Sequence, residues 1–374
     1  MRVPRIIAQF VLCVACYASA SDLRQIGMVN LPGAPGFGQA AFCNGMLLLT
    51  QPGASAVDVF DPVRRRVVAQ ITGLQSPRAI AVDEKSGRVY LADHGSNAIA
   101  VVATDGWKVI DSIALPGSPD ALLLAGDGKL YWADADAETL SLLDLRTKQD
   151  VAETALGGRP RDLAFDRSRQ LLFATLQDAH QIVAVASGLS TSPAPVPGGT
   201  SQSPTSAAVG PGGVSAAGSS ASPAVGASGT NAAPLTVVNR FTLSASQPTG
   251  LIYDPQYHEL YVAVRYAVLA ISADTGAEID RVAAPAGVDS LWLDPDSRTL
   301  FAASEGSLLV MQAKGRLTQV DELATAGVKG RLVAYDADKH MVLIPGGSEG
   351  KSKLLILRPM TANAQPDDSD ARVR

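Results

Sequence analysis

A short apolar motif recurs along this chain at a nearly constant spacing. Copies such as VYLAD (89–93), LYWAD (130–134) and LYVAV (260–264) mark successive units of about 40 residues. The aligned starts fall at residues 46, 89, 130, 172, 260, 300 and 341, so the steps are 43, 41, 42, 88, 40 and 41 residues. A fixed period of this length is typical of architectures in which each repeat is one supersecondary unit.

Each unit has the pattern of four short strands. In the unit at 77–117 the segments RAIAV, RVYLAD, AIAVVAT and KVIDSIAL are separated by the turn residues DEKSG, HGSN and DG. Short runs rich in Val, Ile, Leu and Tyr between Gly, Asp and Asn residues indicate strands. Four strands per 40-residue unit are typical of a propeller blade. The sequence therefore predicts an all-β fold: a single seven-bladed β-propeller of four-stranded blades over residues 21–360.

The two ends of the chain indicate how the ring closes. IGMVNLPG (26–33) matches VIDSIALPG (109–117), which is the fourth strand of its unit, whereas the last unit ends after its third strand, KLLILRP (353–359). We expect the N-terminal strand to complete the last blade, because this pairing leaves no open sheet edge at the junction.

The one long step contains an insert. Residues 189–234 are almost only Ser, Ala, Pro, Gly, Thr and Val, with no charged residue between Asp178 and Arg240. Such a composition cannot offset the entropy cost of ordering. We interpret 189–234 as a disordered insert between the third and fourth strands of the fourth blade; a linker between domains is the alternative. The tail at 361–374 is also predicted to be disordered.

Residues 1–20 have the pattern of a signal peptide. Arg2 and Arg5 precede the apolar run 6–17, and Ala18-Ser19-Ala20 supplies small residues for cleavage. The run is too short to span a membrane, so we predict export, to the periplasm or outside the cell. Lipid attachment at Cys16 is the alternative. The mature chain keeps only Cys43, which excludes an intramolecular disulfide and favours a buried apolar role for this residue.

The charge balance narrows the choice of partners. The formal net charge is −5, and loss of the two arginines in residues 1–20 takes it to −7. An acidic chain without a basic stripe is a poor nucleic-acid binder. No apolar run after residue 20 is long enough to cross a membrane. We expect a monomer that binds a protein or a small anionic ligand.

The units resemble the YVTN β-propeller repeat family, although none of them spells YVTN. The unit at 77–117 carries six residues at family positions: Pro77, Asp83, Gly87, Tyr90, Asn97 and Gly117. The resemblance covers nearly the whole mature chain outside the insert. It implies a propeller fold, and a role among secreted or periplasmic binding proteins, surface-layer proteins or the propeller parts of redox enzymes.

One position of the repeat is expected to line the mouth of the central channel. The loop leading into the first strand of each unit has, at its third position, Gly38, Arg78, Asp120, Arg161, Thr249, Asp289 and Lys329. Arg side chains bind carboxylate or phosphate in a bidentate manner. This ring can hold an anionic or zwitterionic ligand; alternatively, its opposite charges pair with one another and with water.

The loops between second and third strands should form a rim on the same face. Their polar residues include His94, Asn97, Asp134, Asp136 and His180. Counted from Asp134, an EF-hand needs Gly and Glu where this chain has Thr139 and Leu145. We therefore interpret the acids of LYWADADAE as a solvated turn. A transition metal between the two histidines is the alternative, and we predict no metal site.

Catalytic signatures are scarce. The sequence lacks GxSxG, HExxH, a P-loop and paired CxxC motifs. The favoured hypothesis is a non-enzymatic binding scaffold without a cofactor. The alternative is a calcium-dependent lactonase or esterase that uses Asp120 and Asp289. A propeller associated with a periplasmic redox system is the third hypothesis, although no haem or quinone motif is present.

Overall fold

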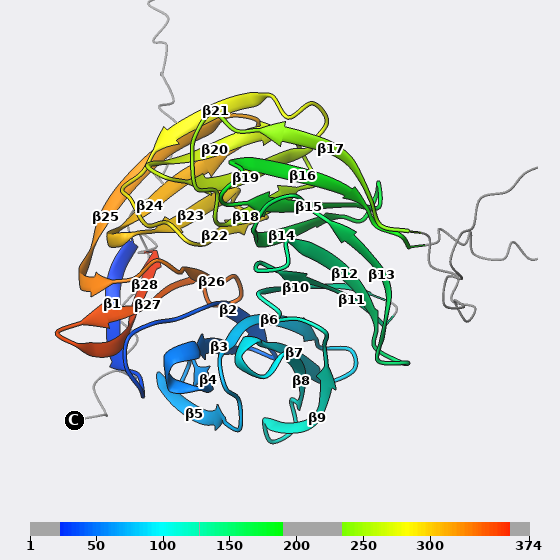
Figure 1. Cartoon of the computed structure of the whole chain (residues 1–374). Coiled ribbons are helices and arrows are strands. Elements are labelled where there is room, and N and C mark those ends of the chain that lie inside the picture. The colour runs from blue at the N-terminus through cyan, green and yellow to red at the C-terminus, as the bar shows by residue number, and fades with distance from the viewer. Residues whose placement is uncertain (1–22, 127, 190–233, 360–374) are drawn as a thin grey trace, which may run out of the picture.

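The computed structural model describes residues 23–126, 128–189 and 234–359, and these residues form a β-propeller (Figure 1). The predicted signal peptide at 1–20, the tail at 361–374 and all but the ends of the 189–234 insert lie outside the described residues. Within them, the only helical turns are η1 (Pro52–Ala54) and η2 (His94–Ser96). No helix in this described part is long and apolar enough to cross a membrane.

Five separate four-stranded sheets form successive blades, each an antiparallel meander running outward from the axis. In chain order their strands are β2 (Ala40–Cys43), β3 (Met46–Gln51), β4 (Ala56–Asp61) and β5 (Arg66–Ile71); β6 (Pro77–Asp83), β7 (Arg88–Asp93), β8 (Ala98–Ala103) and β9 (Lys108–Ala114); β10 (Ala121–Gly126), β11 (Lys129–Asp134), β12 (Thr139–Asp144) and β13 (Gln149–Ala155); β14 (Pro160–Asp166), β15 (Leu171–Leu176), β16 (Gln181–Ala186) and β17 (Thr236–Thr242); β18 (Leu251–Asp254), β19 (Glu259–Val264), β20 (Ala267–Ser272) and β21 (Glu278–Ala283).

The remaining strands form one eight-stranded sheet, which we call the joined sheet. They are β22 (Leu291–Asp294), β23 (Thr299–Ala303), β24 (Glu305–Ala313), β25 (Leu317–Lys329), β26 (Ala334–Asp336), β27 (Met341–Ser348), β28 (Lys351–Pro359) and β1 (Leu23–Asn30). The prediction of seven separate blades is therefore wrong: the described residues form five such blades and the joined sheet.

Strand length and glycine explain the joined sheet. β25 has 13 residues, whereas the fourth strands of the five blades have six or seven, and its last residue, Lys329, pairs with Gly347 of β27. A Cβ atom at Gly346 would lie 2.6 Å from the Lys329 carbonyl oxygen, and one at Gly330 would lie 2.5 Å from that of Pro345. Only glycine permits such a close approach of two backbones.

The N-terminal strand closes the ring. β1 pairs antiparallel with β28, from Leu23 opposite Pro359 to Asn30 opposite Lys353, which is the pairing that the sequence predicted. In Figure 1 the blue β1 lies beside the orange-red β28. On either side of the insert, β16 and β17 pair along their whole length, so that segment connects two neighbouring strands of one blade.

The core lies between the sheets, where the alternating apolar side chains of neighbouring blades pack face to face. The second and third strands are almost fully buried, whereas most residues of the fourth strands are exposed or half-buried. Cys43 is completely buried, as predicted, and burial raises the pKa of its thiol to about 11. The inner strands β2, β6, β10, β14, β18, β22 and β26 surround the axis, and their leading loops open on one face (Figure 1).

Candidate functional site

Six of the seven predicted ring positions lie in the wall of one cavity at the axis, which we call the channel hollow. Its volume is about 270 Å³, and its lining includes Gly38, Arg78, Asp120, Arg161, Thr249 and Asp289. These residues come from five blades and from the loop that leads into β22 of the joined sheet. Because all inner strands start at the same face, equivalent repeat positions converge there.

Lys329 does not lie in the channel hollow, and Arg331 holds the equivalent position. The Val333 N–H donates to Ser290 Oγ (3.0 Å), just as the Leu251 N–H donates to Asp162 Oδ2 (2.9 Å) in an earlier blade. The sequence does contain a signal for this register. Counting back five residues from the aspartate that ends an inner strand leads from Asp83 to Arg78, from Asp254 to Thr249 and from Asp336 to Arg331.

Several ring charges already have partners, either in the neighbouring blade or within the joined sheet. Arg78 Nη1 donates to Asp120 Oδ1, and Asp120 Oδ2 accepts a second bond from the Ala135 N–H (3.0 Å). Arg331 Nη2 lies 2.5 Å from Glu305 Oε1, and its Nη1 lies 3.8 Å from Asp289 Oδ2. Mutual pairing therefore accounts for part of the ring.

Arg161 differs from the other ring cations. Its side chain is exposed and lines the channel hollow. Among the residues that the structure describes, it has no hydrogen bond or ion pair. Its charge acts to lower the pKa values of Asp162 and Asp289, so it lies near both carboxylates. Arg161 is thus the ring cation best able to meet a ligand.

Asp162 is a wall residue that the sequence reasoning missed. Its Oδ1 accepts from the Leu163 N–H and its Oδ2 from the Leu251 N–H, both at 2.9 Å, so it links β14 to β18. Burial raises the pKa of Asp162 to about 6, although these bonds and Arg161 act in the opposite direction. Gln39 and Ser290 accept backbone N–H bonds at the same repeat position. No common residue type marks this position in the sequence.

Asp134 is buried, so its interpretation as part of a solvated turn is wrong. Its Oδ2 accepts from the Ser118 N–H, and its Oδ1 accepts from the N–H groups of Asp136 and Ala137, each at 2.8 Å. The end of a second strand lies beneath the leading loop, whose N–H groups need acceptors. A Cβ atom at Gly117 would lie 2.2 Å from Asp134 Oδ2, so glycine makes this contact possible.

The other predicted rim residues make separate contacts. Asp136 is exposed, and its Oδ1 lies 2.8 Å from Nη2 of Arg159 in an ion pair. Asn97 accepts a bond from Ser118 Oγ (2.7 Å), and His180 Nδ1 accepts one from the Gln247 N–H (3.2 Å). His94 Nδ1 lies 3.4 Å from Asp120 Oδ1. Within the described ranges, no group of three or more His, Cys, Asp or Glu side chains is arranged to hold a metal ion.

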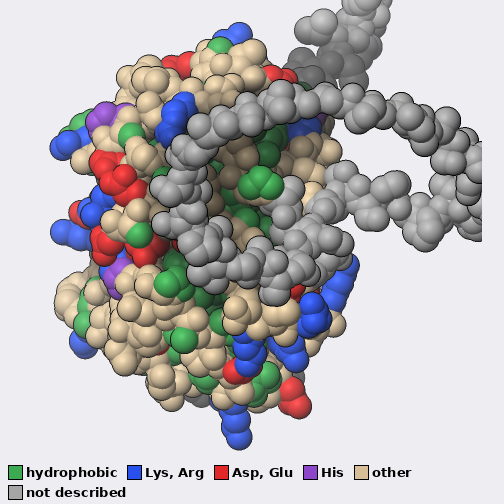
Figure 2. Space-filling view, turned by 45° about the vertical axis from the view of Figure 1, so that its right-hand side comes forward, with side chains coloured by type: hydrophobic (Ala, Val, Ile, Leu, Met, Phe, Trp, Pro, Cys, Tyr) green, Lys and Arg blue, Asp and Glu red, His purple; other side chains and the backbone are tan. Residues whose placement is uncertain are grey.

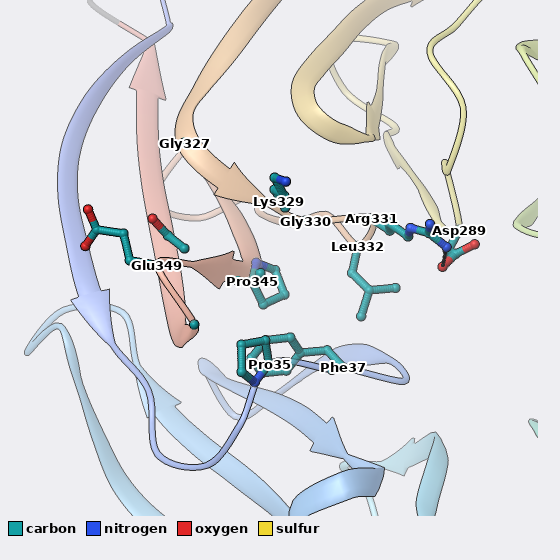
Figure 3. Close-up of a pocket in the computed structure, with 15 residues that line it drawn as sticks. Pro35, Phe37, Asp289, Gly327, Lys329, Gly330, Arg331, Leu332, Pro345 and Glu349 are labelled. Atoms are coloured by element: carbon teal, nitrogen blue, oxygen red, sulfur yellow. Dashed lines mark ion pairs between the residues drawn. The ribbon is translucent and has the colours of Figure 1, made fainter.

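Two further hollows open beside the channel hollow on the same face. The first, which we call the side hollow, has a volume of about 450 Å³ and shares Phe37, Asp289 and Leu332 with the channel hollow (Figure 3). The second has a volume of about 280 Å³, is lined by Gln177, Gln247 and Arg265 among others, and shares Thr249 and Asp289. All three hollows meet at Asp289.

The surface charge is mixed. On the side shown in Figure 2, acidic, basic and histidine side chains lie next to one another along one edge of the molecule. Neighbouring charges of opposite sign favour specific contacts over broad attraction to a polyanion.

Comparison with known proteins gives a fold and no family. No known protein family and no curated protein sequence matches this chain. Its structure is similar to a chain in a crystal structure of a mitotic checkpoint complex, with a TM-score of 0.65 and 10% sequence identity. The match covers 95% of this chain and 99% of the other. At such low identity the likeness shows the fold alone.

Proposed function

We propose that this chain is an exported propeller of the YVTN type that acts as a non-enzymatic binding scaffold. Its partner is a protein held on the face where the leading loops open. The observation that carries the proposal is the meeting of three hollows at Asp289, beside Arg161, which is exposed and has no hydrogen bond or ion pair among the described residues. Concave sites with a few converging polar groups are the usual form of a small-molecule site, and at protein interfaces such pockets receive anchor side chains of the partner.

Most other polar groups of the channel hollow serve the fold. Arg78 and Asp120 bind each other, and Asp162 and Ser290 bind backbone N–H groups of the next inner strand. Asp120 is also the first carboxylate that a calcium-dependent hydrolase would use. Its bonds from Arg78 and Ala135 leave it little capacity for a metal ion, which favours the scaffold over this alternative.

Export and protein binding have separate support. Export rests on the sequence pattern of residues 1–20. The structurally similar chain belongs to a mitotic checkpoint complex, which is consistent with our proposal that this propeller also binds another protein.

Site-specific photo-crosslinking in the native host tests the scaffold. A photoreactive amino acid at exposed Gln247 samples the proposed face, and one at Val63, in the turn between β4 and β5, samples the opposite face. We expect one protein to be crosslinked from position 247 and not from position 63. The same adducts from both positions, or no adduct from position 247, would contradict the proposal.

A further inference from the structure

We propose that the channel hollow and the side hollow together bind a small zwitterion with an apolar side chain, of the class of an aliphatic or aromatic amino acid. The inference rests on the proposed function, because it assigns a ligand to the same face. The site lies where the five separate blades meet the joined sheet.

Arg161 is suited to the carboxylate of such a ligand. It lines the channel hollow, it is exposed, and it has no hydrogen bond or ion pair among the described residues. A guanidinium group presents its donors in a fixed fork that matches a carboxylate. Arg78, the other arginine in this wall, already donates to Asp120.

Asp289 is suited to the ammonium group. Its carboxylate is partly buried, and its one ion pair among the described residues is the long contact of 3.8 Å with Arg331. Arg331 makes its short contact with Glu305 instead, at 2.5 Å. Burial raises the pKa of Asp289 although Arg161 and Arg331 act in the opposite direction, which means that these two cations do not fully offset the loss of solvent around its carboxylate. A ligand ammonium group would add a further counter-charge.

The charge count of the two hollows favours a zwitterion over a simple ion. The channel hollow holds two arginines (Arg78 and Arg161) and three aspartates (Asp120, Asp162 and Asp289), and the side hollow adds Lys329, Arg331 and Glu349, so four positive and four negative charges leave no net charge. A plain anion would lie among four carboxylates, and a plain cation would meet Arg161, which has no ion pair among the described residues. A ligand that carries both charges can satisfy Arg161 and Asp289 together.

The side hollow offers room for an apolar side chain. In Figure 3, the apolar residues Pro35 and Phe37 lie on one side of the opening, and Leu332 and Pro345 lie on the other. The charged residues Lys329, Arg331 and Glu349 also line this hollow, so the apolar side chain would lie against the Pro35, Phe37, Leu332 and Pro345 part of it. Phe37 and Leu332 also line the channel hollow, so the two hollows adjoin each other along wall residues that they share, beside Asp289. The side hollow, with a volume of about 450 Å³, is in the size range of small-molecule sites, whereas the channel hollow, with about 270 Å³, is slightly smaller than that range.

Calorimetry with four small probes tests each part of the site. Leucine carries both charges and an apolar side chain, N-acetyl-leucine lacks the ammonium group, 3-methylbutylamine lacks the carboxylate, and glycine lacks the side chain. Near neutral pH we expect leucine to bind at least about tenfold more tightly than each of the others, since each loses one interaction worth about 1.4 kcal/mol or more.

Charge-neutral variants separate the two ends of the ligand. Arg161→Gln should weaken the binding of leucine and N-acetyl-leucine about tenfold and leave the binding of 3-methylbutylamine unchanged. Asp289→Asn should weaken the binding of leucine and 3-methylbutylamine and leave the binding of N-acetyl-leucine unchanged. Leu332→Ala should lower the affinity for leucine to nearly that for glycine. The control Arg316→Gln changes an exposed arginine paired with Asp280, outside the residues that line the hollows, and should change none of these affinities.

Two results would overturn the zwitterion site. One is the absence of leucine and phenylalanine binding at about 10 mM; the other is equal binding of leucine and N-acetyl-leucine, which would show a plain anion site. If a variant lowers the melting temperature, the four probes on the unmodified protein decide alone. Leucine binding without a crosslinked protein would count against the protein scaffold only, and crosslinks without leucine binding would count against the zwitterion site only.

Discussion

The five separate blades and the joined sheet are held together in different ways. Between separate blades, side chains bind the neighbouring backbone: Thr50 Oγ1 donates to the Arg78 carbonyl (3.2 Å), and Thr175 Oγ1 donates to that of Thr249 (3.1 Å). In the joined sheet, backbone pairs with backbone, through β1 and β28 and at Lys329 and Gly347. The repeat therefore specifies the blades, whereas glycine and strand length specify the joined part.

Removing β1 should have the largest effect. Deletion of residues 23–30 uncovers the edge of β28 and removes the buried side chain of Leu23 from the core. We expect a loss of more than about 5 kcal/mol in the free energy of unfolding, which is a third or more of the roughly 5–15 kcal/mol of a typical domain. Urea denaturation measures this free energy.

Deletion of residues 1–22 alone is the control and should leave the unfolding midpoint unchanged. Equal midpoints for both deletions would show that β1 does not close the ring.

The boundary between the fifth blade and the joined sheet offers two ion pairs for comparison. Arg298 and Asp254 form a buried pair there, whereas Arg316 is 76% exposed in its pair with Asp280. Arg298→Ala should cost about 3–5 kcal/mol in the free energy of unfolding, because Asp254 is left buried without its counter-charge. Arg316→Ala should cost less than about 1 kcal/mol. Similar losses for the two variants would contradict this account of the boundary.

A glycine substitution tests why the sheet is joined. Gly346→Ala places a Cβ atom 2.6 Å from a backbone oxygen, whereas a Cβ atom at Gly53, in the first blade, meets nothing within 4 Å. We expect Gly346→Ala to destabilise the protein by about 1–3 kcal/mol and Gly53→Ala to change stability by less than about 1 kcal/mol. Chemical denaturation checks both; an unchanged midpoint for Gly346→Ala would show that the close approach is not required.

The raised pKa of Asp162 predicts a smaller, pH-dependent effect on stability. This residue lies at a boundary between two separate blades. Its pKa in the folded protein is raised to about 6, above its ordinary value, so the folded state binds more protons between about pH 4 and pH 6. Its contribution to stability is therefore fully present below about pH 4 and is lost as the pH rises through 6. The stability of Asp162→Asn relative to the unmodified protein should rise across this window. A constant difference between the two proteins would contradict the raised pKa.

The sequence predicted what repeats and missed what depends on the tertiary fold. The spacing located the inner strands and thereby brought Arg78, Arg161 and Asp289 to one hollow. It placed Lys329 two residues before the equivalent position, because the glycines around β25 and β27 disturb the pattern at the junction. The role of Asp162 depends on Leu251, which is 89 residues away and beyond the insert, so no local pattern could show it.

Protection from hydroxyl-radical labelling tests the central claim most directly. The claim is that a partner covers the face where the leading loops open. In an extract of the native host, we predict protection of the leading loops at 75–78, 246–249 and 329–332, and none of the opposite turns at 62–65 and 255–258. Protection of the opposite turns, or equal protection of both faces, would contradict the account.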